Sequence, residues 1–507
     1  MIMYSVNNFS SIPVLNNSLV NTNRRMIEFL ELLLYLLASF ILVYYFNVRL
    51  NRFLFLIFLP IIWQSKRDYL WLAFFFILME HPGGFFSGGL RDDPYRLPIY
   101  SIAPGFSITF QELIILVFFI KTLVKNNIKS NSGKPFFNKE LKLLLILYVV
   151  LILISPLFGM SLNSLTNIVK LSIALTLFYS LFQLINNEEQ IVRFLGILFP
   201  FVFVALAFQV YGLMSGQQLV ALIKPGTSVV QGVYDLSDSK AGWFRPIEMG
   251  HAMFINFTGS LWLIAKGNFV FRKQYLLLVN LLSFLVIFLT GTRSWVISFG
   301  AGYLLFFLFM GVKAPKFLSR SFIATVLFVI IINVIPVVNN QIRNSWSRIM
   351  TVEEVIEGDI TGGGTISRYD VRAPKVMEGF MSSSIILGAG FSDHFYRYAD
   401  GHVGYHNILL NTGIAGILLI LYAIFKIIRY PFIIARKDKF LNNQFLKISV
   451  IPMVILLLIN NGTQTIGFTP DGINRFVLMV FALIMIDMAV KKSIQERYPI
   501  QCDYGEQ

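Results

Sequence analysis

Charged residues are scarce in this chain. Asp, Glu, Lys and Arg together make up 14% of the 507 residues, whereas 56% are hydrophobic and the mean hydropathy is +0.68. A water-soluble domain is typically about a quarter charged, so the composition excludes a soluble globular protein. Apolar runs close to the roughly 20 residues needed to cross a bilayer recur along the whole sequence. We therefore expect an all-α bundle of membrane-spanning helices.

Cysteine and nucleotide-binding motifs are also nearly or wholly missing. The single cysteine, Cys502, lies in the polar C-terminal tail, so one chain can build neither an internal disulfide nor a cysteine-based zinc site. There is no G-x-x-x-x-G-K-[ST] phosphate loop and no dinucleotide fingerprint. No G-x-S-x-G pattern frames a serine, so a hydrolase triad has no specific support. These absences argue against chemistry driven by ATP and predict no bound cofactor.

The apolar runs predict about fourteen spans at the length that a bilayer requires. They lie near residues 26–46, 51–64, 68–80, 107–124, 141–158, 164–185, 191–213, 245–265, 274–291, 295–311, 319–337, 406–427, 445–460 and 472–490. No segment is large enough for a separate soluble domain, and no repeat indicates an inverted-repeat transporter. Residues 1–507 are therefore expected to form one membrane domain, with residues 1–23 preceding an uncleaved anchor.

The net charge of +15 follows the loops. With a cytoplasmic N-terminus, about 26 of the 42 Lys and Arg lie in inside segments and about eight in short outside segments, as the positive-inside rule requires. The basic inside segments are Lys66/Arg67, Lys121 to Lys142, Lys266 to Lys273, Lys313 to Arg320, Lys426 to Lys447 and Lys491/Lys492. The charge therefore indicates topology, with both termini cytoplasmic, and not a nucleic-acid partner.

Four segments are predicted on the outer side: 81–106, 214–244, the short turn 291–294, and the longest, 338–405. A connection as long as the last is usually functional or disordered. Within it, residues 367–381 carry apolar residues at roughly helical spacing, which predicts a helix lying on the outer membrane surface and opened by Pro374. Its proposed apolar stripe consists of Val371, Val376, Met377, Phe380 and Met381.

Several polar residues share the predicted outer face. Arg245 precedes one span, Arg293 lies in the outer turn between two spans, Arg368 opens the surface helix and His406 opens the next span. Any one arginine near a helix end is equally well explained by snorkelling to the interface. Together they favour a lipid-linked diphosphate as ligand, because guanidinium groups bind phosphate oxygens bidentately and stay charged.

The histidines allow two interpretations. His402 and His406 are four residues apart and would form a zinc pair if they shared a helical face, completed by His394, Asp393 or Asp400. Gly401 and Gly404 make a regular helix through both unfavourable, and H-E-x-x-H is absent. A proton acceptor at a helix start explains His406 better, because an ordinary histidine pKa of about 6.5 suits general-base work. His251, inside a span, is expected to be structural.

One block of sequence resembles a known family. Gly388-Ala-Gly390-Phe, a spacer, His402-Val-Gly-Tyr-His406-Asn407-Ile-Leu-Leu-Asn-Thr-Gly413-Ile-Ala-Gly416 is similar to the signature of the O-antigen ligase and O-antigen polymerase superfamily. Upstream, Ser367-Arg368 and Thr290-Gly-Thr-Arg293-Ser resemble the family's arginine motifs. Arg245 is similar to its earlier outer-face arginine, although Arg-Pro-Ile-Glu departs from the commoner version. The specific resemblance covers about residues 240–425.

This resemblance implies a fold like that of C-type glycosyltransferases and a reaction on a lipid carrier. His406 would deprotonate an acceptor hydroxyl, and Arg293, Arg245 and Arg368 would stabilise the departing diphosphate. Tyr405, Asn407 and His402 are possible supporting residues of the same site. Metal-dependent relatives of the fold place carboxylates in the first outer loop, and Asn47–Arg52 has none. The expected enzyme is therefore a metal-independent, inverting glycosyltransferase.

The implied partners are an undecaprenyl-diphosphate-linked glycan, membrane lipid and an acceptor, with a chain-length regulator as a further candidate. Polymerisation of polysaccharide repeat units in a bacterial cytoplasmic membrane is the preferred activity, because the predicted span count is high and the outer loop is long. Ligation of the glycan to lipid A core and protein O-glycosylation are alternatives within the class. A transporter or flippase without chemistry is the alternative from another class, with Lys170 and His251 as its candidate mid-membrane groups.

Overall fold

The computed structural model describes most of the chain. The described residues are 22–80, 97–126, 135–215, 249–268, 270–311, 336, 338–343, 345–346, 368–437, 443–462, 466 and 473–497. The predicted span near 319–337 and most of the predicted outer segments 81–106 and 214–244 lie outside these ranges.

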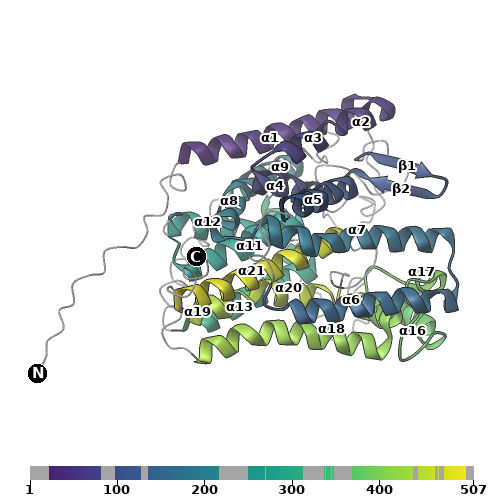
Figure 1. Ribbon diagram of the computed structural model, residues 1–507. Coiled ribbons are helices and arrows are strands. Elements are labelled where there is room, and N and C mark those ends of the chain that lie inside the picture. Colours follow the sequence, from purple (N-terminus) through teal and green to yellow (C-terminus); the bar gives the residue numbers. More distant parts are fainter. Residues whose placement is uncertain are drawn as a thin grey trace, which may run out of the picture.

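Long helices run side by side along one axis of the molecule (Figure 1). Among the described residues, six helical segments are long and apolar enough to cross a membrane. They are α1 (Thr22–Tyr45), α6 (Asn138–Ile154) with the 3-10 turn η1 (Ser155–Phe158), α7 (Leu162–Leu184), α8 (Glu188–Leu198) with α9 (Phe201–Ser215), α13 (Arg293–Met310) and α18 (Gly404–Lys437). The structure thus supports the predicted helical membrane protein.

The other helices of the bundle are shorter, except for the 25-residue α21. They are α2 (Val48–Phe55), α3 (Phe58–Gln64), α4 (Asp68–Leu78), α5 (Phe110–Asn126), α11 (Gly250–Lys266), α12 (Lys273–Leu289), α19 (Asn443–Ile448), α20 (Ile451–Ile459) and α21 (Ile473–Arg497). Three predicted spans are each divided into two helices: residues 51–64 lie in α2 and α3, residues 191–213 in α8 and α9, and residues 445–460 in α19 and α20. Pro452 lies in the first turn of α20, where its missing N–H is tolerated. The described residues do not reach the predicted count of about fourteen spans.

A small sheet corrects the expectation of a purely helical fold. Strands β1 (Ile99–Ala103) and β2 (Phe106–Thr109) pair antiparallel as a hairpin within and just after the predicted outer segment 81–106. Gly105 in the turn has φ +77°, a left-handed conformation that favours glycine. The hairpin leads directly into α5, where Thr109 and Glu112 form a reciprocal cap: the Thr109 N–H donates to the Glu112 carboxylate (2.6 Å) and the Glu112 N–H to the Thr109 hydroxyl (3.2 Å).

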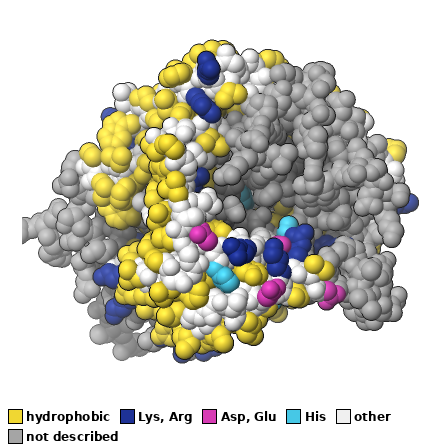
Figure 2. Space-filling model, turned by 90° about the vertical axis from the view of Figure 1, so that its right-hand side faces the viewer, with side chains coloured by type: hydrophobic (Ala, Val, Ile, Leu, Met, Phe, Trp, Pro, Cys, Tyr) yellow, Lys and Arg dark blue, Asp and Glu magenta, His cyan; other side chains and the backbone are white. Residues whose placement is uncertain are grey.

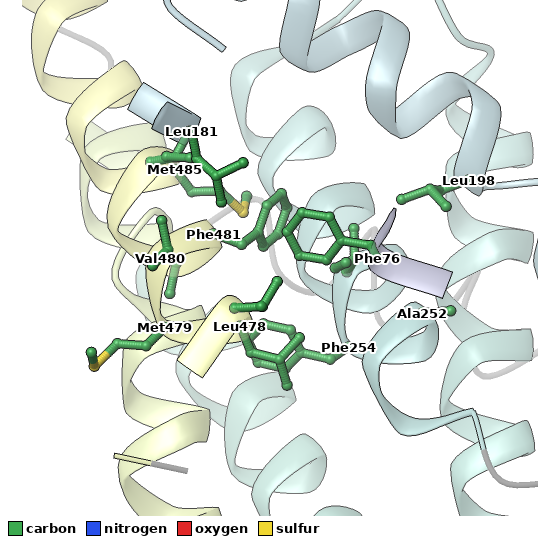
Figure 3. Close-up of a cluster of buried hydrophobic side chains, with 14 of the residues drawn as sticks. Phe76, Leu181, Leu198, Ala252, Phe254, Leu478, Met479, Val480, Phe481 and Met485 are labelled. Carbon is green, nitrogen blue, oxygen red and sulfur yellow. The ribbon is translucent and has the colours of Figure 1, made fainter. Parts of the chain in front are cut away.

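The core lies around helices that are buried on almost every side and mostly apolar. All residues of α4 are buried, as are Gly250–Ala265 of α11 and most of the described side chains of α21. Such helices belong at the centre of a bundle. Figure 3 shows their side chains meeting, with Phe76 of α4 facing Phe481 of α21 at a ring distance of 6.1 Å. Gly259 permits close approach, because a Cβ there would lie 2.5 Å from Leu195 of α8.

The bundle has two different ends. At the end where α1, α4 and α8 begin and α11 and α21 finish, which we call the basic end, ion pairs join neighbouring helices (Figure 1). Glu188 pairs with Lys266 of α11 and with Lys492 of α21 (2.6 Å), and Arg67 forms a bidentate pair with Glu31 of α1 (2.5 and 2.6 Å). Arg67, Lys266 and Lys492 at this end belong to segments that the positive-inside pattern assigns to the cytoplasm.

The opposite end, which we call the loop end, carries the hairpin and the described part of the long predicted loop 338–405 (Figure 1). That part contains the π-helical turn η4 (Arg368–Arg372), α16 (Ala373–Met381) and α17 (Asp393–Tyr398). Residues 338–343 are also helical and attach to the end of α12, where the Gln341 amide donates to the Leu289 carbonyl (2.8 Å). Figure 2 views this end, where basic, acidic and histidine side chains gather beside hydrophobic surface.

Candidate functional site at the start of helix α18

His406 is the third residue of α18, so the prediction that it opens a span is confirmed. The helix can begin here because Gly404 allows the backbone to approach Asn460, the residue that ends α20: a Cβ on Gly404 would lie 2.2 Å from the Asn460 carbonyl oxygen. The His406 imidazole is half-buried. It therefore keeps access to a substrate while its surroundings exclude part of the solvent.

The residues on both sides of His406 are anchored. The Tyr405 hydroxyl donates to the Leu457 carbonyl of α20 (2.7 Å). The Asn407 amide donates to the Asp400 carbonyl (2.5 Å) and accepts from the Asp400 N–H (2.9 Å). These bonds fix the backbone that carries the imidazole, so Tyr405 and Asn407 have positioning roles available to them.

The zinc interpretation does not fit the positions of the two histidines. The helix starts between His402 and His406, so the two residues do not share a helical face. His402 is exposed, and its backbone N–H donates to the Asp400 carboxylate (2.9 Å). The His394 Nε2 lies 2.7 Å from the Gly379 carbonyl oxygen. Among the described residues, no three His, Cys, Asp or Glu side chains come together in a way that could hold a metal ion.

Asp393 has a structural partner set of its own. Its carboxylate accepts from the hydroxyls of Ser161 and Ser164 at the start of α7 (both 2.5 Å), and its N–H donates to the Gly159 carbonyl (2.9 Å). These hydroxyl donors lower the pKa of the Asp393 carboxyl below its ordinary value. The carboxylate thus attaches α17 to the turn between α6 and α7.

The surface helix is present, with one correction to its apolar face. It forms as η4 followed by α16, and Pro374 lies in the first turn of α16 as predicted. Val376 and Phe380 are buried, but Val371 and Met381 are 68% and 64% exposed, so the predicted stripe does not face one way. The π-helical turn before Pro374 rotates Val371 out of the α-helical phase assumed in the prediction.

The three predicted arginines are described to different extents. Arg293 is half-buried and is the first residue of α13, two residues before Trp295, whose ring packs against Gly250 at the start of α11. For Arg368 only the backbone is described, at the start of η4. Arg245 lies outside the described residues. The described backbone therefore puts Arg293, Arg368 and His406 at the loop end.

Sequence reasoning missed a buried carboxylate at this end. Glu80, just after α4, accepts from the first amides of α11, those of His251 (3.1 Å) and Ala252 (2.6 Å). Its carboxylate is also 3.7 Å from the His251 imidazole. This arrangement is favourable because negative charge is stabilised at a helix N-terminus. The acidic residue at the end of the apolar run 68–80 was the sequence feature that could have predicted it. The contacts agree with the expectation that His251 is structural.

A break in α18 is the second missed feature. Gly413 has φ +66° and ψ −174°, which interrupts the helix and frees backbone groups on both sides. Residues 385–390 lie across the break and bond to these groups. The amides of Ala389 and Gly390 donate to the carbonyls of Leu410 (2.8 Å) and Asn411 (2.9 Å), and the amides of Ile414 and Ala415 donate to the carbonyls of Ile385 and Ile386 (both 3.0 Å). We call this arrangement the α18 clasp.

Glycine makes the clasp sterically possible. A Cβ on Gly413 would lie 2.2 Å from the Ile386 carbonyl oxygen, and a Cβ on Gly388 would lie 2.5 Å from the Gly413 nitrogen. Gly388 and Gly390 also have positive φ, +73° and +62°. The Asn411 side chain closes the arrangement by donating to the Gly390 carbonyl (2.7 Å). Gly388, Gly390 and Gly413 of the sequence signature are therefore architectural, and His406 lies seven residues before Gly413 along the helix.

The length of α18 relates His406 to the membrane. His406 and the exposed Lys426 are separated by about 20 residues, or roughly 30 Å at the helical rise per residue. This matches the hydrocarbon thickness of a bilayer, about 30 Å. Because α18 is long and apolar enough to cross a membrane, the spacing is compatible with His406 near one membrane boundary and Lys426 near the other.

Comparison with known proteins adds no relative: no protein-family model matches the chain, and neither does any curated protein.

Proposed function

We propose that this protein transfers a glycan from an undecaprenyl-diphosphate carrier to an acceptor hydroxyl at the outer face of a bacterial cytoplasmic membrane, with polymerisation of repeat units as the preferred activity. One observation carries the proposal: a half-buried histidine lies at the start of an apolar helix of membrane-spanning length, between two anchored residues, Tyr405 and Asn407. A carrier lipid presents its diphosphate at the same depth, where the hydrocarbon meets water.

The chemistry follows from these positions. The His406 imidazole accepts the proton of the acceptor hydroxyl, and the hydroxyl oxygen attacks the anomeric carbon of the donor sugar with inversion. The bond from that carbon to the phosphate oxygen breaks, and its electron pair leaves with the diphosphate. His406 then releases the proton to water. Cleavage of the bond between the sugar and the diphosphate supplies the free energy of the reaction. No nucleotide is needed, which agrees with the missing nucleotide-binding motifs.

The leaving diphosphate needs positive charge that is in place before the bond breaks. Arg293 supports this part of the proposal, because it opens α13 at the same end of the bundle as His406. Arg245 and the Arg368 side chain, which lie outside the described part of the structure, are assigned to the diphosphate by the family resemblance.

The transporter alternative receives less support. Ionisable groups at mid-membrane depth in several helices are expected of a transporter. His251, one of its candidates, is the second residue of α11 and contacts Glu80, so this buried pair lies near a helix end. Lys170, the other candidate, lies in α7 and is only half-buried.

A purified-protein assay tests the proposal. The protein in nanodiscs is incubated with a lipid-linked oligosaccharide and its acceptor, and the new glycosidic bond is detected by mass spectrometry. We expect His406→Ala to lower turnover by a factor of about 10² or more, the typical contribution of a general base. The control is His394→Ala, which removes one of the two described histidines, His394 and His402, of the loop that leads into α18. Equal turnover in wild type and His406→Ala would remove the proposed base, and a bilayer-crossing lipid without a new bond would favour the transporter.

Two further measurements sharpen the assignment. Turnover is expected to survive EDTA, and a loss restored by a divalent ion would contradict the metal-independent mechanism. Deleting the gene separates the activities within the class: single-repeat glycan at the surface indicates a lost polymerase, and long glycan left on the carrier indicates a lost ligase. Loss of glycan from secreted proteins instead indicates protein O-glycosylation.

A further inference from the structure

Three consecutive aliphatic side chains are exposed at the loop end. Ile385, Ile386 and Leu387 are 48%, 67% and 38% exposed, although they directly precede the buried residues Gly388 and Ala389. A run of exposed aliphatic residues in a loop is unfavourable in water and marks a surface that contacts protein or lipid. The position of the run, its neighbouring side chains and its backbone hydrogen bonds favour lipid over protein.

The clasp determines the depth of this run. The Ile385 and Ile386 carbonyls bond to the amides of Ile414 and Ala415, so the run lies level with the break at Gly413. Gly413 is seven residues beyond His406, or roughly 10 Å further along α18. With His406 at the membrane boundary, as the length of α18 allows, the three side chains would lie within the outer part of the hydrocarbon layer.

The exposed run is continuous with surface that faces lipid. On α18 the exposed apolar face begins at Ile414 (46%) and continues through Leu418 (60%). On the neighbouring segment, Leu153 of α6 and Leu157 of η1 are 71% and 78% exposed. Both segments belong to helices long and apolar enough to cross a membrane, and at such helices exposed aliphatic side chains face the acyl chains.

Many polar backbone groups around the run are hydrogen-bonded within the protein, as an apolar environment requires. Irregular backbone at membrane depth is tolerated only where its polar groups are bonded within the protein. Here the Ser383 hydroxyl donates to the Phe380 carbonyl (2.8 Å), the Leu387 N–H donates to the Ser384 hydroxyl (3.1 Å) and the Gly388 N–H donates to the Ser384 carbonyl (2.6 Å). Together with the clasp, these bonds satisfy much of the polar backbone of the segment.

We propose that residues 383–390 form a re-entrant segment, which enters the outer leaflet beside α18 and presents Ile385, Ile386 and Leu387 to the lipid acyl chains. The long loop 338–405 is then anchored in the membrane at this point. This inference depends on the membrane position of α18 and not on glycan transfer, so it stands or falls separately from the proposed enzyme activity.

Spin-label accessibility tests the proposal on the full-length protein. In a Cys502→Ser background, which has no other cysteine, single cysteines are placed at Ile386, at Leu418 as the lipid-facing reference, and at Lys375, an exposed residue of α16, as the water-facing reference. Each labelled variant is reconstituted in nanodiscs. Power-saturation EPR then measures collisions with oxygen, which concentrates in acyl chains, and with a water-soluble nickel chelate.

We expect the ratio of oxygen to nickel collisions at Ile386→Cys to match that at Leu418→Cys and to exceed that at Lys375→Cys several-fold. A ratio at Ile386→Cys equal to that at Lys375→Cys would overturn the proposal, because the run would then lie in water. Low collision rates with both reagents would also overturn it, because another segment or a second copy of the chain would then cover the run. Ile385→Cys provides an independent site if Ile386→Cys fails to reconstitute, and the glycosidic-bond assay on each variant reports the enzyme activity separately.

Discussion

The two ends of the bundle are held together by different kinds of interaction. At the basic end, long side chains reach between helices, as in the pairs from Glu188 to Lys266 and Lys492. At the loop end, backbone groups bond to backbone groups across the break in α18, and side chains such as Asn407 and Glu80 bond to main-chain atoms. A flexible ion pair tolerates a shift of the helices that it joins. A backbone clasp built on glycine does not, so the end that carries His406 is the more precisely defined one.

The strongest test of this difference is Gly413→Ala. A Cβ would lie 2.2 Å from the Ile386 carbonyl oxygen at a residue with φ +66°, so either the clasp or the helix break must give way. We expect the free energy of unfolding to fall by about 3 kcal/mol or more, observed as a lower melting temperature in detergent. Gly300→Ala in α13 is the matched control, because its Cβ meets nothing within 4 Å. Equal melting temperatures for the two variants would contradict the clasp.

A smaller loss is expected from Asn407→Ala. The substitution leaves the Asp400 N–H and carbonyl without their side-chain partner, which costs about 1–2 kcal/mol, and it loosens the backbone beside His406. Turnover should fall together with the melting temperature, and Asn407→Asp, which keeps an acceptor for the Asp400 N–H, should retain part of both. An unchanged turnover in Asn407→Ala would show that His406 does not depend on this anchor.

The basic end should be more tolerant. Glu188→Gln removes the charge that pairs with Lys266 and Lys492, but the side chain is 33% exposed, so we expect a loss below about 1 kcal/mol that shrinks as salt is added. Melting temperatures at low and high NaCl measure this effect. Glu189→Gln, which affects the pair with Arg193 alone, is the control. A loss as large as that of Gly413→Ala would reverse the comparison of the two ends.

The smallest expected effect concerns acid. Asp393 has a pKa below its ordinary value because the Ser161 and Ser164 hydroxyls donate to it. Its stabilising contribution is therefore complete above the unfolded-state pKa of about 4 and is lost as the pH falls through the lower folded-state pKa. Without the two hydroxyls, in Ser161→Ala/Ser164→Ala, this contribution should be small at every pH. Melting curves of both proteins from pH 7 to pH 3 should converge in acid, and a constant difference would show that Asp393 does not titrate as expected.

Hydropathy correctly predicted a mostly helical chain with membrane-spanning segments, because apolar content over about 20 residues is enough to indicate a span. The sequence also predicted the start of α18 at His406 and the helix opened by Pro374. Both were predictable because glycines before a helix and a proline in its first turn are local signals. Hydropathy did not predict the division of residues 51–64 into α2 and α3 or the hairpin before α5, because apolar content alone does not distinguish one straight helix from two short ones or from a strand pair.

The candidate site was only partly predictable for a related reason. Its residue types were visible, and so was the order Gly388, Gly390, His406, Gly413 in the sequence. The bonds between residues 385–390 and residues 410–415 join segments that the sequence separates by the whole of α17 and the turn before α18. Glu80 is even further along the sequence from His251, from whose backbone N–H it accepts a hydrogen bond. Such contacts arise from the packing of the bundle and have no periodic signal.

The clasp also closes residues 390–404 into a loop whose two ends both contact α18. From Gly390, which is bonded to Asn411 of α18, the polypeptide passes through α17 and enters α18 at Gly404. The helical stretch from His406 to Asn411 joins the two points directly. The distance between the imidazole and the break is therefore determined within α18 itself, while Asp400 and Asp393 hold residues 391–403 to Asn407 and to the start of α7. The stretch from His406 to Asn411 thus acts as a spacer of constant length between the two ends of this loop.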